Sequence, residues 1–292
     1  MSTYHYKKID AFTAKNSLGN PAACLYLSQQ DKLDDLTMQN IALEHKGFVS
    51  EVVYCRPETS SYELIYFSSE CEVDFCGHGT IACMYDLIKS IPDLLSKQEI
   101  IINTRQKGQL TVYNHIPEEN AIYITAPAPT YFELALTLEE IALTLGISPS
   151  TISSKHPIDL INAGLKTLIV PITSLADEVS FYPNEASLKD FCLTNQIDII
   201  LVYSFDTSYS PNFAHTRVFA PKFGYLEDPA TGSGNSAFGY YLLKNNLWDG
   251  SAISLEQGGN NRVYNEVKLN TINGQVLFGG CATTRINGEY IL

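Results

Sequence analysis

The sequence has little positive charge and no long apolar stretch. It contains 19 Lys and Arg against 32 Asp and Glu, which gives a formal net charge of −13 at pH 7 with neutral His. Because nucleic-acid binding needs clustered cationic side chains, this balance argues against a nucleic-acid partner. No apolar run approaches the roughly 18 residues of a membrane-spanning helix, and residues 1–10 lack the apolar stretch of a secretory signal. We therefore expect a soluble, cytoplasmic protein with no membrane partner.

Patterns that would indicate disulfides, metals or dinucleotides are also missing. The seven cysteines are an odd number and include no Cys-x-x-Cys pair, which fits a reducing compartment better than a disulfide framework. The Gly-x-Gly segments lack the full dinucleotide fingerprint with its acidic residue about 20 positions on. We expect no metal site, since no metal-ligand spacing to Cys or carboxylate is found at His5, His45, His115, His156 and His215.

One segment is present twice, as Cys76–Lys89 and as Thr231–Lys244. Such a repeat indicates two structurally similar halves. In each copy a Gly-x-Gly turn leads into a helical pattern, so unpaired N–H groups and the positive end of a helix dipole are available to an anion. The identical pairs include Gly77 with Gly232, Gly79 with Gly234, Ala82 with Ala237 and Tyr85 with Tyr240. The copies differ at their chemically capable positions, where Cys76 and His78 are matched by Thr231 and Ser233.

The remaining pattern predicts two β-rich halves, each wrapped around one helix of the repeat. Helical periodicity is present at 33–45, 80–89, 138–145, 185–194 and 233–245, and Thr137 and Glu140 are spaced as a capping box. The two prolines of Ala126–Thr130 interrupt helix and ladder alike, so we expect a hinge there. The first half is predicted at 1–126, completed by a C-terminal strand near 279–292, and the second at 127–278. Strands are expected at 4–12, 22–27, 51–55, 62–68, 99–104, 109–115, 121–125, 158–162, 167–172, 198–205, 215–220, 251–256, 267–271, 275–278 and 281–286.

Four segments carry a resemblance to a known family. They are Asp10–Thr13 with Gly19–Ala23, Cys76–Thr80, Arg217–Pro221 and Glu227–Gly234. Together they resemble the phenazine-biosynthesis PhzF-like family, from about Tyr6 to the C-terminus. The resemblance implies the diaminopimelate-epimerase-like fold, an α+β fold of two pseudo-symmetric halves, each a rolled, mostly antiparallel sheet around a central helix. It also implies an active site in the cleft between the halves, and we expect a homodimer.

The resemblance further implies a cofactor-independent isomerase that moves a proton on a small unsaturated carboxylic acid by general acid/base catalysis. By family position Glu51 is the proton-transferring group, and His78, Asp228 and Ser233 complete the catalytic set. The residues expected to bind the carboxylic-acid substrate are Gly77, Gly79, Thr80, Thr231, Gly232 and Gly234.

The residues themselves support these roles to different degrees. Glu51 opens a strand after an apolar passage, so its carboxylate could lie in a partly dry cleft and alternate between base and acid. On sequence alone a solvated glutamate is the commoner outcome, and the family position reverses that balance. The rivals Glu44 and His45 end an amphipathic pattern and are expected to be exposed.

The other candidate side chains each have a structural reading beside the functional one. His78 lies between two glycines, which let a ligand approach closely, although its ring could also complete local hydrogen bonding. Asp228 precedes Pro229, which favours an extended backbone, but Asp-Pro also starts turns. Ser233 could cap a helix, donate to an anion, or do both.

Cys76 leaves two alternatives open. Racemases of the same superfamily place two thiols across the substrate, and here the second position is Thr231, whose hydroxyl is far less acidic than a thiol. A hydroxyproline-type dehydratase using Cys76 and Thr231 is the main enzymatic alternative, and a non-catalytic protein that binds small acids is the other. A buried cysteine acting as a small hydrophobe is the reading that we favour for Cys76. The loop Gly258–Arg262 departs from the family pattern, so its role at the substrate or in a dimer stays open.

Overall fold

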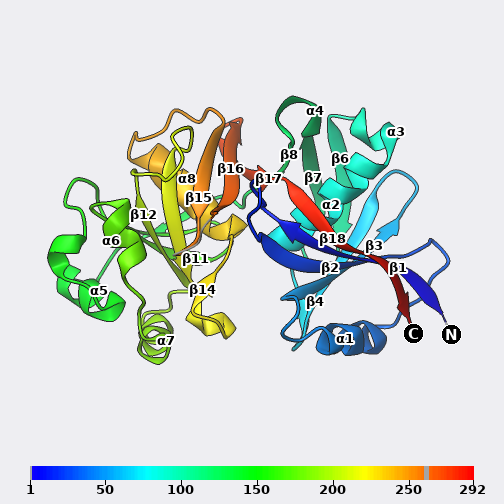
Figure 1. The fold of residues 1–292 in the computed structure, drawn as a ribbon, viewed down its shortest axis with the longest axis horizontal. Helices are drawn as coiled ribbons and strands as arrows, with labels where there is room; N and C mark the ends of the chain where they lie inside the picture. Colours follow the sequence, from blue (N-terminus) through cyan, green and yellow to red (C-terminus); the bar gives the residue numbers. More distant parts are fainter. Residues whose placement is uncertain (1, 260–262) are drawn as a thin grey trace. The chain divides into compact units, whose positions relative to one another are not determined.

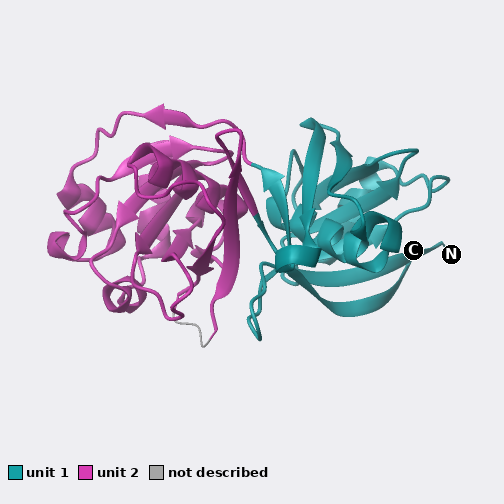
Figure 2. Cartoon of the chain, turned by 90° about the horizontal axis from the view of Figure 1, so that it is seen from above, with its two compact units in different colours: residues 1–125, 279–292 teal, residues 126–278 magenta. Residues whose placement is uncertain are grey.

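The computed structural model describes residues 2–259 and 263–292 and divides into two compact units (Figure 2). Unit 1 comprises residues 1–125 and 279–292, and unit 2 comprises residues 126–278. Within the described residues, no helix is both long and apolar enough to span a membrane.

Unit 1 is one sheet rolled around helix α2 (Gly77–Ser90) (Figure 1). The β2–β3 and β4–β6 pairs are parallel and the other neighbours are antiparallel. Because α2 contacts both β18 and β8, which end the strand order on opposite sides, the sheet curves around the helix. The strand order is β18 (Ala282–Ile291), β1 (Thr3–Ala11), β2 (Asn20–Tyr26), β3 (Glu51–Pro57), β4 (Tyr62–Ser68), β6 (Glu99–Thr104), β7 (Gly108–His115) and β8 (Ala121–Thr125), with β5 (Glu72–Val73) on β4.

Unit 2 repeats this arrangement around helix α8 (Gly232–Lys244). The β11–β12 and β13–β15 pairs are parallel, at the places that correspond to the parallel pairs of unit 1. The strand order is β9 (Thr130–Phe132), β10 (Asp159–Asn162), β11 (Lys166–Pro171), β12 (Ile199–Ser204), β13 (Ala214–Phe219), β15 (Ile253–Gln257) and β16 (Asn265–Ile272), with β14 (Glu227–Asp228) on β13. The chain then turns through Asn273 and Gly274, both with positive φ as a tight hairpin turn requires, into β17 (Gln275–Gly280).

The two copies of the sequence repeat form the central helices of the two units. Cys76 is the N-cap of α2 with φ −120° and ψ 107°, and Thr231 is the N-cap of α8 with φ −122° and ψ 106°. Both helices are buried over most of their surface, which explains why small residues recur in both copies. The predicted α+β fold of two similar halves, each a rolled, mostly antiparallel sheet around a central helix, is confirmed.

Further helices cover the outer faces of the sheets. In unit 1, α1 (Asp35–Glu44) packs on β3 and β4 over a core that includes Tyr54 and Phe67. In unit 2, α5 (Leu138–Leu145) and α7 (Glu185–Thr194) enclose a second core. The capping box predicted at Thr137 and Glu140 is present at the start of α5. The shorter helices are α3 (Pro92–Leu95), α4 (Ile116–Glu119) and α6 (Leu175–Ser180), with 3-10 turns at Pro149–Thr151 and Pro221–Phe223.

The helical periodicity predicted at 33–45 corresponds to α1, but the apolar residues that carry it are not the ones that are buried. The helix buries Met38, Ile41 and Ala42, whereas Leu36 and Leu43 are exposed. The apolar residues of this segment therefore do not mark its buried face, because the side on which the sheet lies decides which residues are covered.

The expected exposure of His45 was also wrong. Its ring is buried, with Nδ1 2.7 Å from the Ile41 carbonyl oxygen and Nε2 3.1 Å from the Tyr6 hydroxyl. Glu44 is exposed, as predicted. The two-residue strands β5 and β14 and the short helices α3, α4 and α6 were not predicted, because segments this short show no periodicity.

Candidate active site

Glu51 reaches the central helix of unit 1 because of strand alternation. Alternate side chains of a strand share a face, so Glu51 projects on the same face of β3 as Val53. A Cβ added at Gly79 of α2 would lie 2.8 Å from Val53 Cγ2, which shows that this face lies against the start of α2. Glycine at position 79 therefore lets the helix start approach the strand that carries Glu51.

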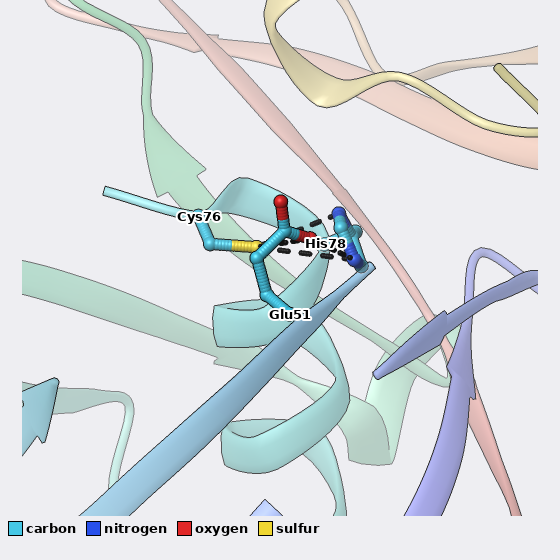
Figure 3. A group of neighbouring side chains, drawn as sticks. All are labelled: Glu51, Cys76 and His78. Atoms are coloured by element: carbon cyan, nitrogen blue, oxygen red, sulfur yellow. Dashed lines mark hydrogen bonds and ion pairs between the residues drawn. The ribbon is translucent and has the colours of Figure 1, made fainter. Parts of the chain in front are cut away.

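Three side chains converge at this point, as Figure 3 shows. Glu51 Oε2 lies 3.2 Å from His78 Nε2 and 3.7 Å from Cys76 Sγ. Cys76 Sγ lies 3.5 Å from His78 Nδ1 and 3.8 Å from Nε2. The Glu51 and His78 side chains are 19% and 14% exposed, so the group is largely buried and partly open to solvent.

The start of α2 is organised by Cys76. Its sulfur accepts the Gly79 N–H at 3.3 Å, and its carbonyl oxygen accepts the Thr80 hydroxyl at 2.7 Å. Thr80 is fully buried, and its hydroxyl also contacts the Tyr66 hydroxyl. The N–H groups of Gly77 and His78 head the helix, where no acceptor exists within it, and the positive end of the dipole favours an anion.

Burial and mutual contact set the protonation of this group. Burial of the His78 ring opposes its charged form, but the Cys76 sulfur and then the Glu51 carboxylate raise the pKa of His78 well above its ordinary value. Burial also raises the pKa of the Cys76 thiol, although the neighbouring His78 acts to lower it. Burial therefore favours a protonated thiol at Cys76, which leaves the Glu51 carboxylate as the charged neighbour that favours an imidazolium at His78.

The matching helix start in unit 2 contains no ionisable sulfur or imidazole. The Thr231 hydroxyl donates to Asp228 Oδ2, and both residues are buried. Gln257 accepts the Thr231 N–H at 2.9 Å and donates to its hydroxyl at 3.0 Å, so Thr231 is held on both sides. Ser233 is partly exposed. The hydroxyl of Thr231, like that of Thr80, is occupied by hydrogen bonds within the unit.

The glycines of this second helix start are required by close packing. A Cβ added at Gly232 would lie 2.5 Å from the Phe278 ring, and one at Gly234 would lie 3.2 Å from Ile199 Cδ1.

Sequence reasoning did not find Gln257, which is fully buried and anchors Thr231 from 26 residues away. A lone glutamine in a strand gives no signal of such a role. Of the loop Gly258–Arg262, residues 260–262 lie outside the described part of the chain.

Comparisons with known proteins agree on a family. Residues 9–288 match the family described as phenazine biosynthesis-like protein, PhzC-PhzF. The chain is 30% identical to antisense-enhancing sequence 1 of Schizosaccharomyces pombe, with 99% of each chain covered. It is 28% identical to the uncharacterized isomerase YfhB of Bacillus subtilis, with 86% of this chain and 85% of the relative covered. Among solved structures it is similar to a PhzF-family phenazine biosynthesis protein of Bacillus anthracis, with 26% identity, a TM-score of 0.86 and all of both chains covered.

Proposed function

Because the chain belongs to the phenazine biosynthesis-like protein family, whose curated members include isomerases, we propose that it is an isomerase in which Glu51 moves a proton on a small unsaturated carboxylic acid. One observation carries the proposal. A carboxylate lies 3.2 Å from an imidazole at the start of a buried helix, in a group that is only partly exposed.

The chemistry assigns a role to each group. Glu51 takes a proton from the carbon next to the substrate carboxyl group, the C–H electron pair moves into the conjugated system, and the proton returns to another carbon as the double bond migrates. The intermediate carries extra negative charge on the substrate carboxyl oxygens. His78, charged at neutral pH, and the N–H groups that head α2 stabilise that charge.

The residues of unit 2 enter the proposal through the family resemblance. We assign Asp228 and Ser233 to the substrate site together with Gly232 and Gly234. Replacing Ser233 with Ala should raise KM if its hydroxyl donates to the substrate, and an unchanged KM would remove it from the site. No cofactor is needed for this reaction. We propose separately that the protein is a homodimer, which light scattering during gel filtration can test.

A second candidate reaction follows from the position of Cys76. Its sulfur contacts both Glu51 and His78, so a thiol could take part in proton transfer during dehydration of a hydroxylated cyclic amino acid. This hydroxyproline-type dehydratase ranks second because burial keeps the thiol protonated and Thr231 is engaged by Asp228 and Gln257.

Hydrogen exchange in deuterated water separates these candidates. The protein is incubated with a panel of small unsaturated and hydroxylated carboxylic acids, and products are analysed by NMR and mass spectrometry. Deuterium at carbon with a shifted double bond supports the isomerase, and loss of water supports the dehydratase. Saturable binding with no exchange for any acid in the panel would contradict both and support a binding protein.

A further inference from the structure

Glu51, Cys76 and His78 offer a metal ion one oxygen, one sulfur and one nitrogen. One such atom from each residue lies within 4.8 Å of the others, in a group drawn from β3 and the start of α2 (Figure 3). Carboxylate, thiolate and imidazole are the three side-chain ligands of zinc. We propose that these residues form a three-ligand site for a thiophilic divalent cation such as Zn²⁺, and that the bound cation blocks the acid/base step.

The distances between the donor atoms fit tetrahedral coordination. With Zn–O and Zn–N bonds of about 2.05 Å and a Zn–S bond of about 2.3 Å, neighbouring ligand atoms are about 3.4 Å apart for an N···O pair and about 3.6 Å for pairs with sulfur. The observed separations are 3.2 Å for His78 Nε2 to Glu51 Oε2, 3.7 Å for Cys76 Sγ to Oε2 and 3.8 Å for Sγ to Nε2. The side chains therefore need shifts of only a few tenths of an ångström, together with a turn of the imidazole ring towards the metal.

Charge and hydrogen bonding suit the same ligand. A thiolate and a carboxylate neutralise a divalent cation, so the filled site adds no net charge to a largely dry region. The Gly79 N–H already points at Cys76 Sγ, at 3.3 Å, and would fix the orientation of a coordinating sulfur. Three protein ligands leave a fourth position for water or a substrate carboxylate, as in zinc sites that are not purely structural.

The functional consequence rests on the proposed isomerase mechanism. Glu51 cannot accept a substrate proton while its oxygen is bound to the cation, and His78 cannot stay protonated while its nitrogen is a ligand. We therefore expect micromolar-range Zn²⁺ to inhibit turnover reversibly, with activity restored by a chelator and with substrate protecting the enzyme.

Cobalt substitution tests the site independently of activity. Co²⁺ titrated into the wild-type protein should give one ion per chain and a thiolate-to-metal charge-transfer absorption in the near ultraviolet. Cys76→Ser should abolish that absorption, and His78→Ala should weaken Zn²⁺ binding, measured by competition with a chromogenic chelator, by roughly 10²-fold or more. Circular dichroism checks that each variant is folded.

Matched controls come from the surface of the same unit. Cys71 is an exposed free cysteine, and His115 forms a partly exposed pair with Glu119 at 3.3 Å, so Cys71→Ser and His115→Ala should leave binding unchanged. A wild-type protein without the thiolate absorption, or an absorption lost in Cys71→Ser and kept in Cys76→Ser, would overturn the metal site. A cobalt site in a protein that shows no exchange with any acid would instead contradict the proposed function alone.

Discussion

At the scale of single residues, the site combines a carboxylate, an imidazole and a thiol in mutual contact. The Glu51 carboxylate beside it favours the charged form of His78, and Cys76 keeps its proton because it is buried. Glu51 lies in contact with both. This combination underlies the proposed roles, with the carboxylate as base and the imidazolium as stabiliser of negative charge.

Replacing Glu51 with Gln tests this assignment. The amide keeps the shape of the side chain but cannot accept a proton, so turnover should fall by roughly 10²-fold or more with little change in ligand affinity. The measurement is kcat with a substrate from the exchange panel, alongside binding by calorimetry. Glu99→Gln, at an exposed position of β6, is the matched control and should behave like wild type. Wild-type turnover of the Glu51 variant would contradict the assignment.

Replacing Cys76 with Ser separates the isomerase from the dehydratase. Serine preserves the N-cap of α2, and the thiol is held protonated, so isomerase turnover should stay within about tenfold of wild type. Alkylation of the wild-type protein by iodoacetamide should be slow at Cys76, as followed by peptide mass spectrometry. Fast, stoichiometric inactivation through this one residue would move the thiol-dependent dehydratase to first place.

At the scale of elements, the two helix starts are positioned by glycines that allow close packing. Gly79 accommodates Val53 in unit 1, and Gly232 accommodates the Phe278 ring in unit 2. The same helix start thus recurs with the same backbone angles, while the side chains at its first positions differ. The backbone of the helix start is therefore shared by the two units, and the side chains at its first positions distinguish them.

Replacing Gly232 with Ala should therefore destabilise the protein. The new Cβ would meet the Phe278 ring at 2.5 Å, and overpacking of this kind costs about 1–3 kcal/mol. Urea denaturation measures the change in the free energy of unfolding. Gly288→Ala, where a Cβ would meet nothing within 4 Å, should change it by less than about 0.5 kcal/mol. Equal stability of the two variants would show that Phe278 moves aside freely.

At the scale of the whole molecule, a buried ionisable pair remote from the Glu51 group in sequence is expected to make stability depend on pH. Glu178 of α6 and His215 of β13 are both fully buried, with Oε1 3.0 Å from Nδ1. Burial raises the pKa of Glu178 well above its ordinary value. The positive charge of Arg217 acts to lower this pKa, and the negative charges of Glu227 and Glu256 act to raise it. Burial, together with Arg217, lowers the pKa of His215 to about 3. Both side chains are therefore neutral in the folded protein near neutral pH.

This pair predicts the direction of pH dependence. Glu178 makes its full contribution to the free energy of unfolding below pH 4.5. This contribution is lost as pH rises above 4.5, because the folded state then keeps a proton that the unfolded state releases. His215 makes its full contribution to the free energy of unfolding above pH 6.5. This contribution is lost as pH falls towards 3, because the unfolded state then binds a proton that the folded state does not. Between pH 4.5 and 6.5 the two effects oppose each other, so the pair should give a plateau with a fall in stability on either side.

The variant Glu178→Gln isolates one half of this effect. Its amide cannot titrate, so the stability of wild type relative to the variant should be constant below about pH 4.5. Above that pH it should fall by up to about 1.4 kcal/mol per pH unit. Denaturant unfolding at several pH values measures the difference, with the exposed Glu185→Gln as control. A difference that does not change with pH would show that Glu178 is ionised in the folded protein.

The sequence by itself determined the fold class, the family and the two central helices. These follow from signals that are local or repeated, and that can be recognised without knowing which residues are neighbours in space. They are the Gly-x-Gly starts at 77–79 and 232–234, the capping box at Thr137 and the strand alternation. The assignment of catalytic roles to Glu51, His78, Asp228 and Ser233 stays a prediction, since it came from family position.

Only the tertiary structure decided which side chains meet. Glu51 and Cys76 are 25 residues apart, and their contact depends on the strand pairing and on the missing side chain at Gly79. The expectation of no metal site rested on histidine spacing along the chain, which does not register that folding brings Glu51, Cys76 and His78 together. Burial of His45, the exposed Leu36 and Leu43, and the Glu178 to His215 pair share this cause, because burial depends on what packs above a residue rather than on its own polarity.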